Sequence, residues 1–127
     1  MAASSEVDLA ERENEARGVF NPKVVDLISW DAEREEVVLL MLEERPWESE
    51  PRQLHQLEDK FNAYLSYVQG GYLVREYPDY EGRDVCFALD CAEAPRGEAQ
   101  AMLRSMQDFA SGEGIRFAVR VIQDSAG

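Results

Sequence analysis

Apolar side chains between residues 51 and 68 recur at the spacing of an α-helix. They are Leu54, Leu57, Phe61, Tyr64, Leu65 and Val68. A stripe this wide must be buried against a sheet or a partner. Ser49 is a residue type that caps helix N-termini, Pro51 suits a first turn, and Gly70-Gly71 gives a C-cap or a kink. We therefore predict a long helix that begins after Ser49 and runs to Gln69.

Two strand-like runs precede this helix. The first covers residues 24–30 and is rich in β-branched side chains, and the second, from Val37 to Leu42, is apolar at six consecutive positions. A strand that is apolar on both faces is typical of a central or doubly covered position in a sheet. The polar turn at residues 31–35 predicts that the two strands form a hairpin.

Two further strands and a second helix follow. Residues 84–91 and 115–122 alternate between apolar and other side chains, which predicts strands. The helix between them has one apolar stripe: Ala99, Met102, Leu103, Met106, Phe109 and Ala110. Residues 72–78, before a turn at 78–82, fit either a short helix or a short strand.

The predicted order is ββαβαβ, which indicates an α+β fold with a four-stranded mixed sheet. Right-handed crossovers place both helices on one face if the strand order follows the sequence. The other face would then expose apolar side chains of the first two strands. We therefore expect a homodimer through that face, or coverage by the N-terminal arm. The expected division is a flexible acidic arm at 1–20, a single domain at 21–123 and a frayed tail at 124–127.

Charge narrows the possible partners. The 127 residues contain 26 acids and 13 bases, for a net charge of −13 at pH 7. This sign repels phosphate backbones and anionic lipids, so we expect no nucleic-acid or membrane partner. The first residues are neither a signal peptide nor a membrane anchor, so we expect a cytoplasmic protein. The charge favours solubility, and the alternative is an acidic mimic that binds a basic protein through Glu43, Glu44 and Glu48.

Few residues suit catalysis or metal binding. Cys86 and Cys91 stand five apart in one predicted strand, so their side chains point to opposite faces and cannot easily pair. The single imidazole, His55, lies off the apolar stripe and near Glu58 and Asp59. No metal-ligand spacing and no phosphate-binding glycine loop are present. We predict no catalytic residue, no metal and no cofactor.

The expected function is a non-enzymatic module that binds another protein or itself. The alternative is a small-molecule-binding or enzymatic domain. Its pocket would draw together Trp47, Lys60, Asn62 and Tyr77.

Several motifs also resemble a known family. They are Val25-Asp26-Leu27-Ile28, Val37-Val38-Leu39, Arg45-Pro46-Trp47, Tyr77-Pro78 and the helix sequence Leu57-Glu58-Asp59-Lys60-Phe61-Asn62-Ala63-Tyr64-Leu65. With these, residues 23–122 resemble a family of short bacterial proteins catalogued as a domain of unknown function. The most specific part is Asn62-Ala63-Tyr64-Leu65 after Trp47. The resemblance implies the domain limits and a bacterial origin, and it transfers no site residue.

Overall fold

The computed structural model describes residues 16–48 and 50–122. Its elements, in order, are β1 (Leu27–Asp31), β2 (Glu36–Glu43), α2 (Pro51–Gln69), α3 (Tyr72–Glu76), the 3₁₀ helix η1 (Pro78–Tyr80), β3 (Asp84–Cys91), α4 (Gly97–Gly112) and β4 (Ile115–Val121). The predicted α+β class is confirmed, and residues 72–76 are helical. Most of the predicted arm and the tail lie outside the described residues. The prediction of Ser49 as the N-cap was wrong, because α2 begins at Pro51 with Glu50 at its N-cap position.

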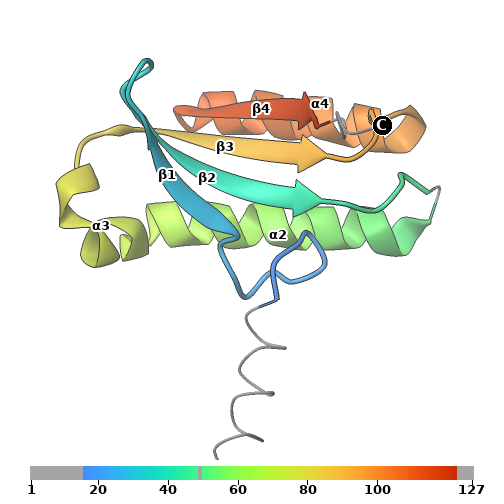
Figure 1. Cartoon of the computed structure of the whole chain (residues 1–127), viewed down its shortest axis with the longest axis horizontal. Helices are drawn as coiled ribbons and strands as arrows, with labels where there is room; N and C mark the ends of the chain where they lie inside the picture. The colour runs from blue at the N-terminus through green and yellow to red at the C-terminus, as the bar shows by residue number, and fades with distance from the viewer. Residues whose placement is uncertain (1–15, 49, 123–127) are drawn as a thin grey trace, which may run out of the picture.

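The four strands form one sheet in the order β1-β2-β3-β4. β1 is antiparallel to β2, whereas β2, β3 and β4 are parallel to one another. Figure 1 shows the sheet in front, with α2 and α4 both behind it. This is the arrangement that two right-handed crossovers produce when strand order follows the sequence. The mixed sheet with both long helices on one face is therefore as predicted.

The core lies between the sheet and the two long helices. Leu39, Phe87 and Phe117 are aligned on neighbouring strands, and all three are buried. Phe61 of α2 packs on this row, with its ring centroid 6.0 Å from that of Phe87 and 5.6 Å from that of Phe117. Aromatic pairs at such distances add to the stability that burial provides. The predicted stripe of α2 is thus its buried face.

The sequence interpretation was wrong about Phe109. Its side chain was expected in the buried stripe of α4, but it is 54% exposed. The helix instead buries Leu103, Met106 and Ala110, and Phe109 lies at the edge of that stripe, where its ring packs edge-on against Phe61 with the centroids 6.2 Å apart. A stripe read from periodicity can be wider than the surface that the neighbouring elements cover.

The folded part also begins earlier than expected. Val19, which was assigned to the arm, is 1% exposed in the core, and its N–H donates to the carbonyl of Leu42 at 2.8 Å. As a result β1 begins at Leu27, and residues 24–26 form part of a loop instead of the predicted strand. This loop is held by the buried side chain of Asp26, described below.

Candidate functional site

The four residues of the expected pocket lie in different parts of the structure. Trp47 is buried in the loop after β2, where its Nε1 donates to the carbonyl of Glu93 at 2.8 Å. Tyr77 lies between α3 and η1, is 41% exposed and stacks on Tyr80, which in turn stacks on Trp30 of β1. These contacts attach the segment between α3 and β3 to the helix-facing side of β1, which is a structural role.

Asn62 and Lys60 are also separated. Asn62 is exposed on the side of α2 that faces α4, where it lines a groove with Phe61 and Met102. Lys60 is fully buried on the side of α2 that faces the loop before β1. The structure therefore does not bring Trp47, Lys60, Asn62 and Tyr77 together around one cavity.

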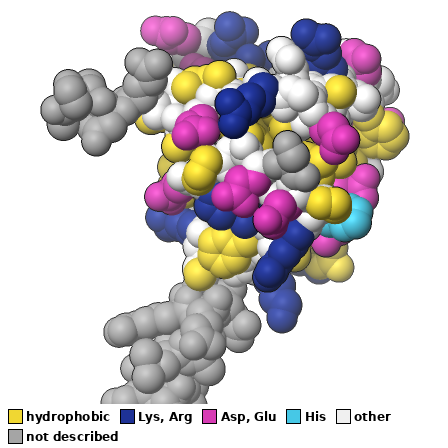
Figure 2. All heavy atoms as spheres, turned by 90° about the vertical axis from the view of Figure 1, so that its right-hand side faces the viewer, with side chains coloured by type: hydrophobic (Ala, Val, Ile, Leu, Met, Phe, Trp, Pro, Cys, Tyr) yellow, Lys and Arg dark blue, Asp and Glu magenta, His cyan; other side chains and the backbone are white. Residues whose placement is uncertain are grey.

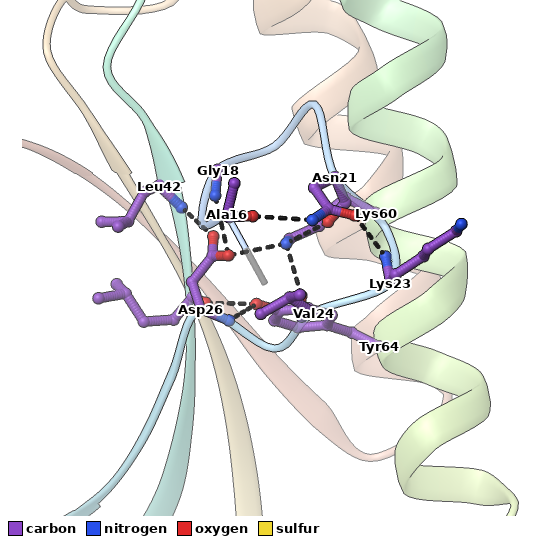
Figure 3. A network of polar contacts seen from close by, with 10 residues as sticks. Ala16, Gly18, Asn21, Lys23, Val24, Asp26, Leu42, Lys60 and Tyr64 are labelled. Carbon is purple, nitrogen blue, oxygen red and sulfur yellow. Dashed lines mark hydrogen bonds and ion pairs between the residues drawn. The ribbon is translucent and has the colours of Figure 1, made fainter. Parts of the chain in front are cut away.

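Lys60 belongs to a buried polar network that ties the first described residues to the core (Figure 3). Its ammonium donates to the carbonyl oxygens of Asn21 and Val24, both at 2.6 Å, and to Oδ1 of Asp26 at 2.8 Å. An ammonium group has three donors, so all of them are used. Lys60 is thus a structural residue with no donor left for a ligand.

Asp26 completes the network from the other side. Its Oδ1 also accepts from the backbone N–H of Gly18 and its Oδ2 from that of Leu42, each at 2.9 Å. The hydroxyl of Tyr64 accepts from the N–H of Asp26 and donates to the carbonyl of Leu40. Burial lowers the pKa of Lys60, and the bond to Asp26 opposes this shift. The network fixes the loop before β1 against α2 and β2.

The acidic cluster predicted at the end of β2 is only partly a surface charge. Glu43 is 1% exposed, and its two carboxylate oxygens accept from Nε and Nη2 of Arg45, each at 2.7 Å. Arg45 also donates from Nη1 to Gln56 at 2.8 Å. Only Glu44 and Glu48 are exposed. Figure 2 shows acidic and basic side chains interspersed over this end of the molecule, without a field of one sign.

A polar hollow of about 560 Å³ opens beside this ion pair, lined in part by Phe20, Arg45, Gln53 and Glu48. Gln53 is buried, donates to the carbonyl of Pro46 and accepts from the N–H of Glu48. Among the described residues, every buried polar side-chain atom has a hydrogen-bond partner. The hollow therefore presents no polar atom that is buried and in need of a ligand.

Neither cysteine has the surroundings of a nucleophile. Cys86 and Cys91 are both buried and free, and they lie on opposite faces of β3 as predicted. Burial raises the pKa of Cys91 to about 12, and the nearby carboxylate of Glu43 adds to the shift. A thiol with a raised pKa stays protonated and unreactive near neutral pH. His55 is exposed, and within the described chain no three His, Cys, Asp or Glu side chains are grouped to hold a metal ion.

The most distinctive surface is the face of the sheet that carries no helix, here called the open face. Its centre consists of the apolar side chains Leu27, Val38, Leu40, Ala88, Ala118 and Leu42, which neighbour one another through the strand register. Leu27 is 46% exposed, and Val38, Leu40 and Leu42 are half-buried. Sheets made only of parallel strands are almost always covered on both faces, and three of the four strands here are parallel. Among the described residues, no element covers this one (Figure 1).

Two cross-strand ion pairs border the apolar centre of the open face. Arg116 of β4 reaches over Cys86 to Glu36 of β2, and Arg120 donates from Nε to Oδ1 of Asp90 at 2.6 Å. Arg116 and Arg120 lie in the strand predicted at residues 115–122, but their ion-pair partners were not predicted. The signal was available, because Glu36 and Asp90 are acids inside or beside strands, where a charged side chain needs a partner on its own face.

No helix in the described part of the chain is long and apolar enough to cross a bilayer. No curated protein and no solved structure matches the chain. Residues 18–123 match a family described as "Family of unknown function (DUF6572)", which confirms the resemblance to a family without an assigned activity. Because this match spans most of its length, the chain belongs to the family of unknown function DUF6572.

Proposed function

We propose that the protein is a self-associating module that forms a homodimer through the open face of its sheet. The observation that supports this is the uncovered apolar centre, which lies on β1 and on the three parallel strands β2, β3 and β4. Burying Leu27, Leu40 and their neighbours against a second copy would remove from water the apolar surface that the two helices cannot reach.

The distribution of charge favours the open face over the rest of the surface as the dimer interface. Two copies that each carry −13 repel one another, so they associate best where the local charge is small. On the open face Arg116 and Arg120 neutralise Glu36 and Asp90 within each chain. The apolar centre between these pairs carries no charge, and the ion pairs form a polar rim of the kind found around protein interfaces.

A second copy of the chain covers the open face better than residues 1–15 could. That segment contains five acids and one base, and its only large apolar residues are Met1, Val7 and Leu9. Three such side chains cannot cover a face to which four strands contribute. The pocket alternative has less support, because Trp47, Lys60, Asn62 and Tyr77 do not converge and Lys60 has no free donor.

The test is the mass of the full chain in solution. We expect light scattering at micromolar concentration to return twice the chain mass of 14.4 kDa. Leu40→Lys places a charge in the centre of the open face and should return the mass of one chain. Ala101→Lys adds the same charge on an exposed position of α4 and should leave the dimer intact.

A monomeric wild-type protein at this concentration would overturn the proposal whatever the variants do. So would a Leu40→Lys protein that still melts cooperatively and remains a dimer, because the interface would then lie elsewhere. Deleting residues 1–15 tests whether that segment, and not the open face, mediates association. If the shortened chain is monomeric, the association depends on residues 1–15.

A further inference from the structure

A second apolar surface lies on the opposite side of the molecule, along the seam where α2 and α4 run side by side. Its main hollow, of about 450 Å³, is lined by Phe61, Met102, Met106 and Phe109, with the polar side chains Glu58, Asn62 and Ser105 at the rim. Phe61 and Met106 are buried and form the floor, whereas Phe109 is 54% exposed and forms a wall. Together they form one contiguous apolar patch, and contiguous patches, unlike single exposed side chains, often mark interaction sites.

The hollow continues toward the start of both helices. A second cavity of about 250 Å³ is lined by Trp47, Leu54 and Ala99, with Arg96 and Glu98 beside them. Leu54 precedes Glu58 by about one helical turn, so the two cavities follow one another along the seam. From Arg96 to Phe109 the helix advances about 20 Å, which is the length of about three to four turns of a docked helix.

The charge along the seam is negative. Glu48, Glu58 and Glu98 line the two cavities, and the only base that lines either of them is Arg96. These acids have exposed side chains and no ion pair that the structure describes. An apolar floor between acidic rims is complementary to a helix that is apolar on one face and basic on its flanks.

We propose that the seam between α2 and α4 is a docking site for a basic amphipathic helix of another protein. The apolar face of that helix inserts against Phe61, Met102 and Phe109, and its Lys or Arg side chains pair with Glu58 and Glu98. Methionine suits such a site, because its flexible and polarisable side chain adapts to different partners.

Other occupants fit the seam less well. Residues 1–15 carry five acids and one base, so their charge repels Glu58 and Glu98. A second copy of the chain, docked seam to seam, would bring its own Glu58 and Glu98 close to these acids and be repelled. This inference is independent of the proposed dimer, because the open face lies on the other side of the sheet; a dimer would present two such seams outward.

The test uses a labelled peptide of about 18 residues with leucines at helical i, i+3, i+4, i+7 spacing and lysines on the flanks. Fluorescence anisotropy with the full chain at low salt should show saturable binding. A peptide with the same leucines and glutamate in place of lysine should bind at least about 10-fold more weakly, a difference that one or two charge pairs can supply.

Two variants of the protein assign the site. Phe109→Ser removes the exposed wall and should weaken binding about 10-fold or more, as expected for an aromatic anchor. Glu58→Gln with Glu98→Gln should weaken binding and reduce its dependence on salt. The matched control is Glu33→Gln with Glu81→Gln, which removes the same charge at exposed positions away from the seam and should leave the affinity unchanged.

Three results would overturn the inference: no binding of the lysine peptide, equal binding of both peptides, or unchanged binding by a folded Phe109→Ser protein. Circular dichroism and the dimer mass of each variant verify folding and keep this test separate from that of the open face. If Phe109→Ser abolishes the dimer instead, the seam is an interface between copies and the inference fails.

Discussion

At the scale of single residues, the pair formed by Lys60 and Asp26 fixes the start of the folded chain. Both side chains are inaccessible to solvent, all three donors of the ammonium are used, and both carboxylate oxygens accept hydrogen bonds. A buried pair of this kind adds little stability compared with a well-packed apolar replacement. Removing one partner has a different consequence, because it leaves a charge buried without compensation.

Lys60→Met should lower the free energy of unfolding by about 3 to 5 kcal/mol, because Asp26 would keep its charge without the ammonium. Urea denaturation measures this loss. The other lysine, Lys23, gives the matched control: it is exposed, and Figure 3 shows its side chain directed away from the network. Lys23→Met should change the stability by no more than about 0.5 kcal/mol.

A double-mutant cycle separates the ion pair from simple packing. The double variant Lys60→Met with Asp26→Asn should lose less stability than the sum of the two single losses, by about 1 to 3 kcal/mol. If the two losses add, the charges of Lys60 and Asp26 are not coupled, and packing alone explains the loss in each single variant.

At the scale of elements, the turn between α2 and α3 depends on one glycine. Gly71 has φ = 83°, which is in the left-handed region, and a Cβ built on it would meet no atom within 4 Å. The obstacle to another residue is therefore the backbone conformation and not the available space. Left-handed φ is unfavourable for residues with a Cβ by about 1 to 2 kcal/mol.

Gly71→Ala should destabilise the protein by about 1 to 2 kcal/mol in thermal or urea denaturation. Gly112 is the matched control, because it lies in the last turn of α4 without a positive φ and with equally open space around its Cα. Gly112→Ala should be neutral or stabilising by up to about 1 kcal/mol. Equal losses in both variants would show that the sign of φ does not explain the turn.

At the scale of the whole molecule, stability should fall in alkaline solution. Burial raises the pKa of Cys91 from 9.0 to about 12 and that of Tyr67 from 10.0 to about 12, and burial also raises the pKa of Tyr64. The folded protein therefore keeps protons that the unfolded chain releases. Because the unfolded state binds fewer protons, the free energy of unfolding decreases as pH rises above about 9. The lowered pKa of Lys60 acts in the opposite sense.

The contribution of Cys91 can be isolated from the slope. Between about pH 9 and 11, the free energy of unfolding should fall with pH less steeply for Cys91→Ala than for wild type. The two slopes should differ by about 1 kcal/mol per pH unit. Val85→Ala, in the same strand and on the same face, should lower the stability without changing the slope. A slope unchanged by Cys91→Ala would mean that the thiol ionises as readily in the folded as in the unfolded protein.

The sequence by itself determined the elements and their order. Helical spacing of Leu57, Phe61 and Tyr64 and the alternation of residues 84–91 are consequences of local backbone geometry, so they are visible without a structure. The handedness of crossovers then placed both helices on one face. The open face followed as well, because a run of six apolar residues in β2 has to present side chains on both sides of the sheet.

Only the tertiary structure decided which distant residues meet. Asp26 and Lys60 are 34 positions apart, so no local sequence pattern indicates that they meet. For the same reason residues 24–26 were predicted to be in a strand, although the network holds them in a loop. Phe109 has the spacing of a core residue, yet the sheet and α2 cover only part of its helix. Periodicity determines the direction of a side chain relative to its own element. Its burial depends on where the other elements pack, which a single sequence does not encode locally.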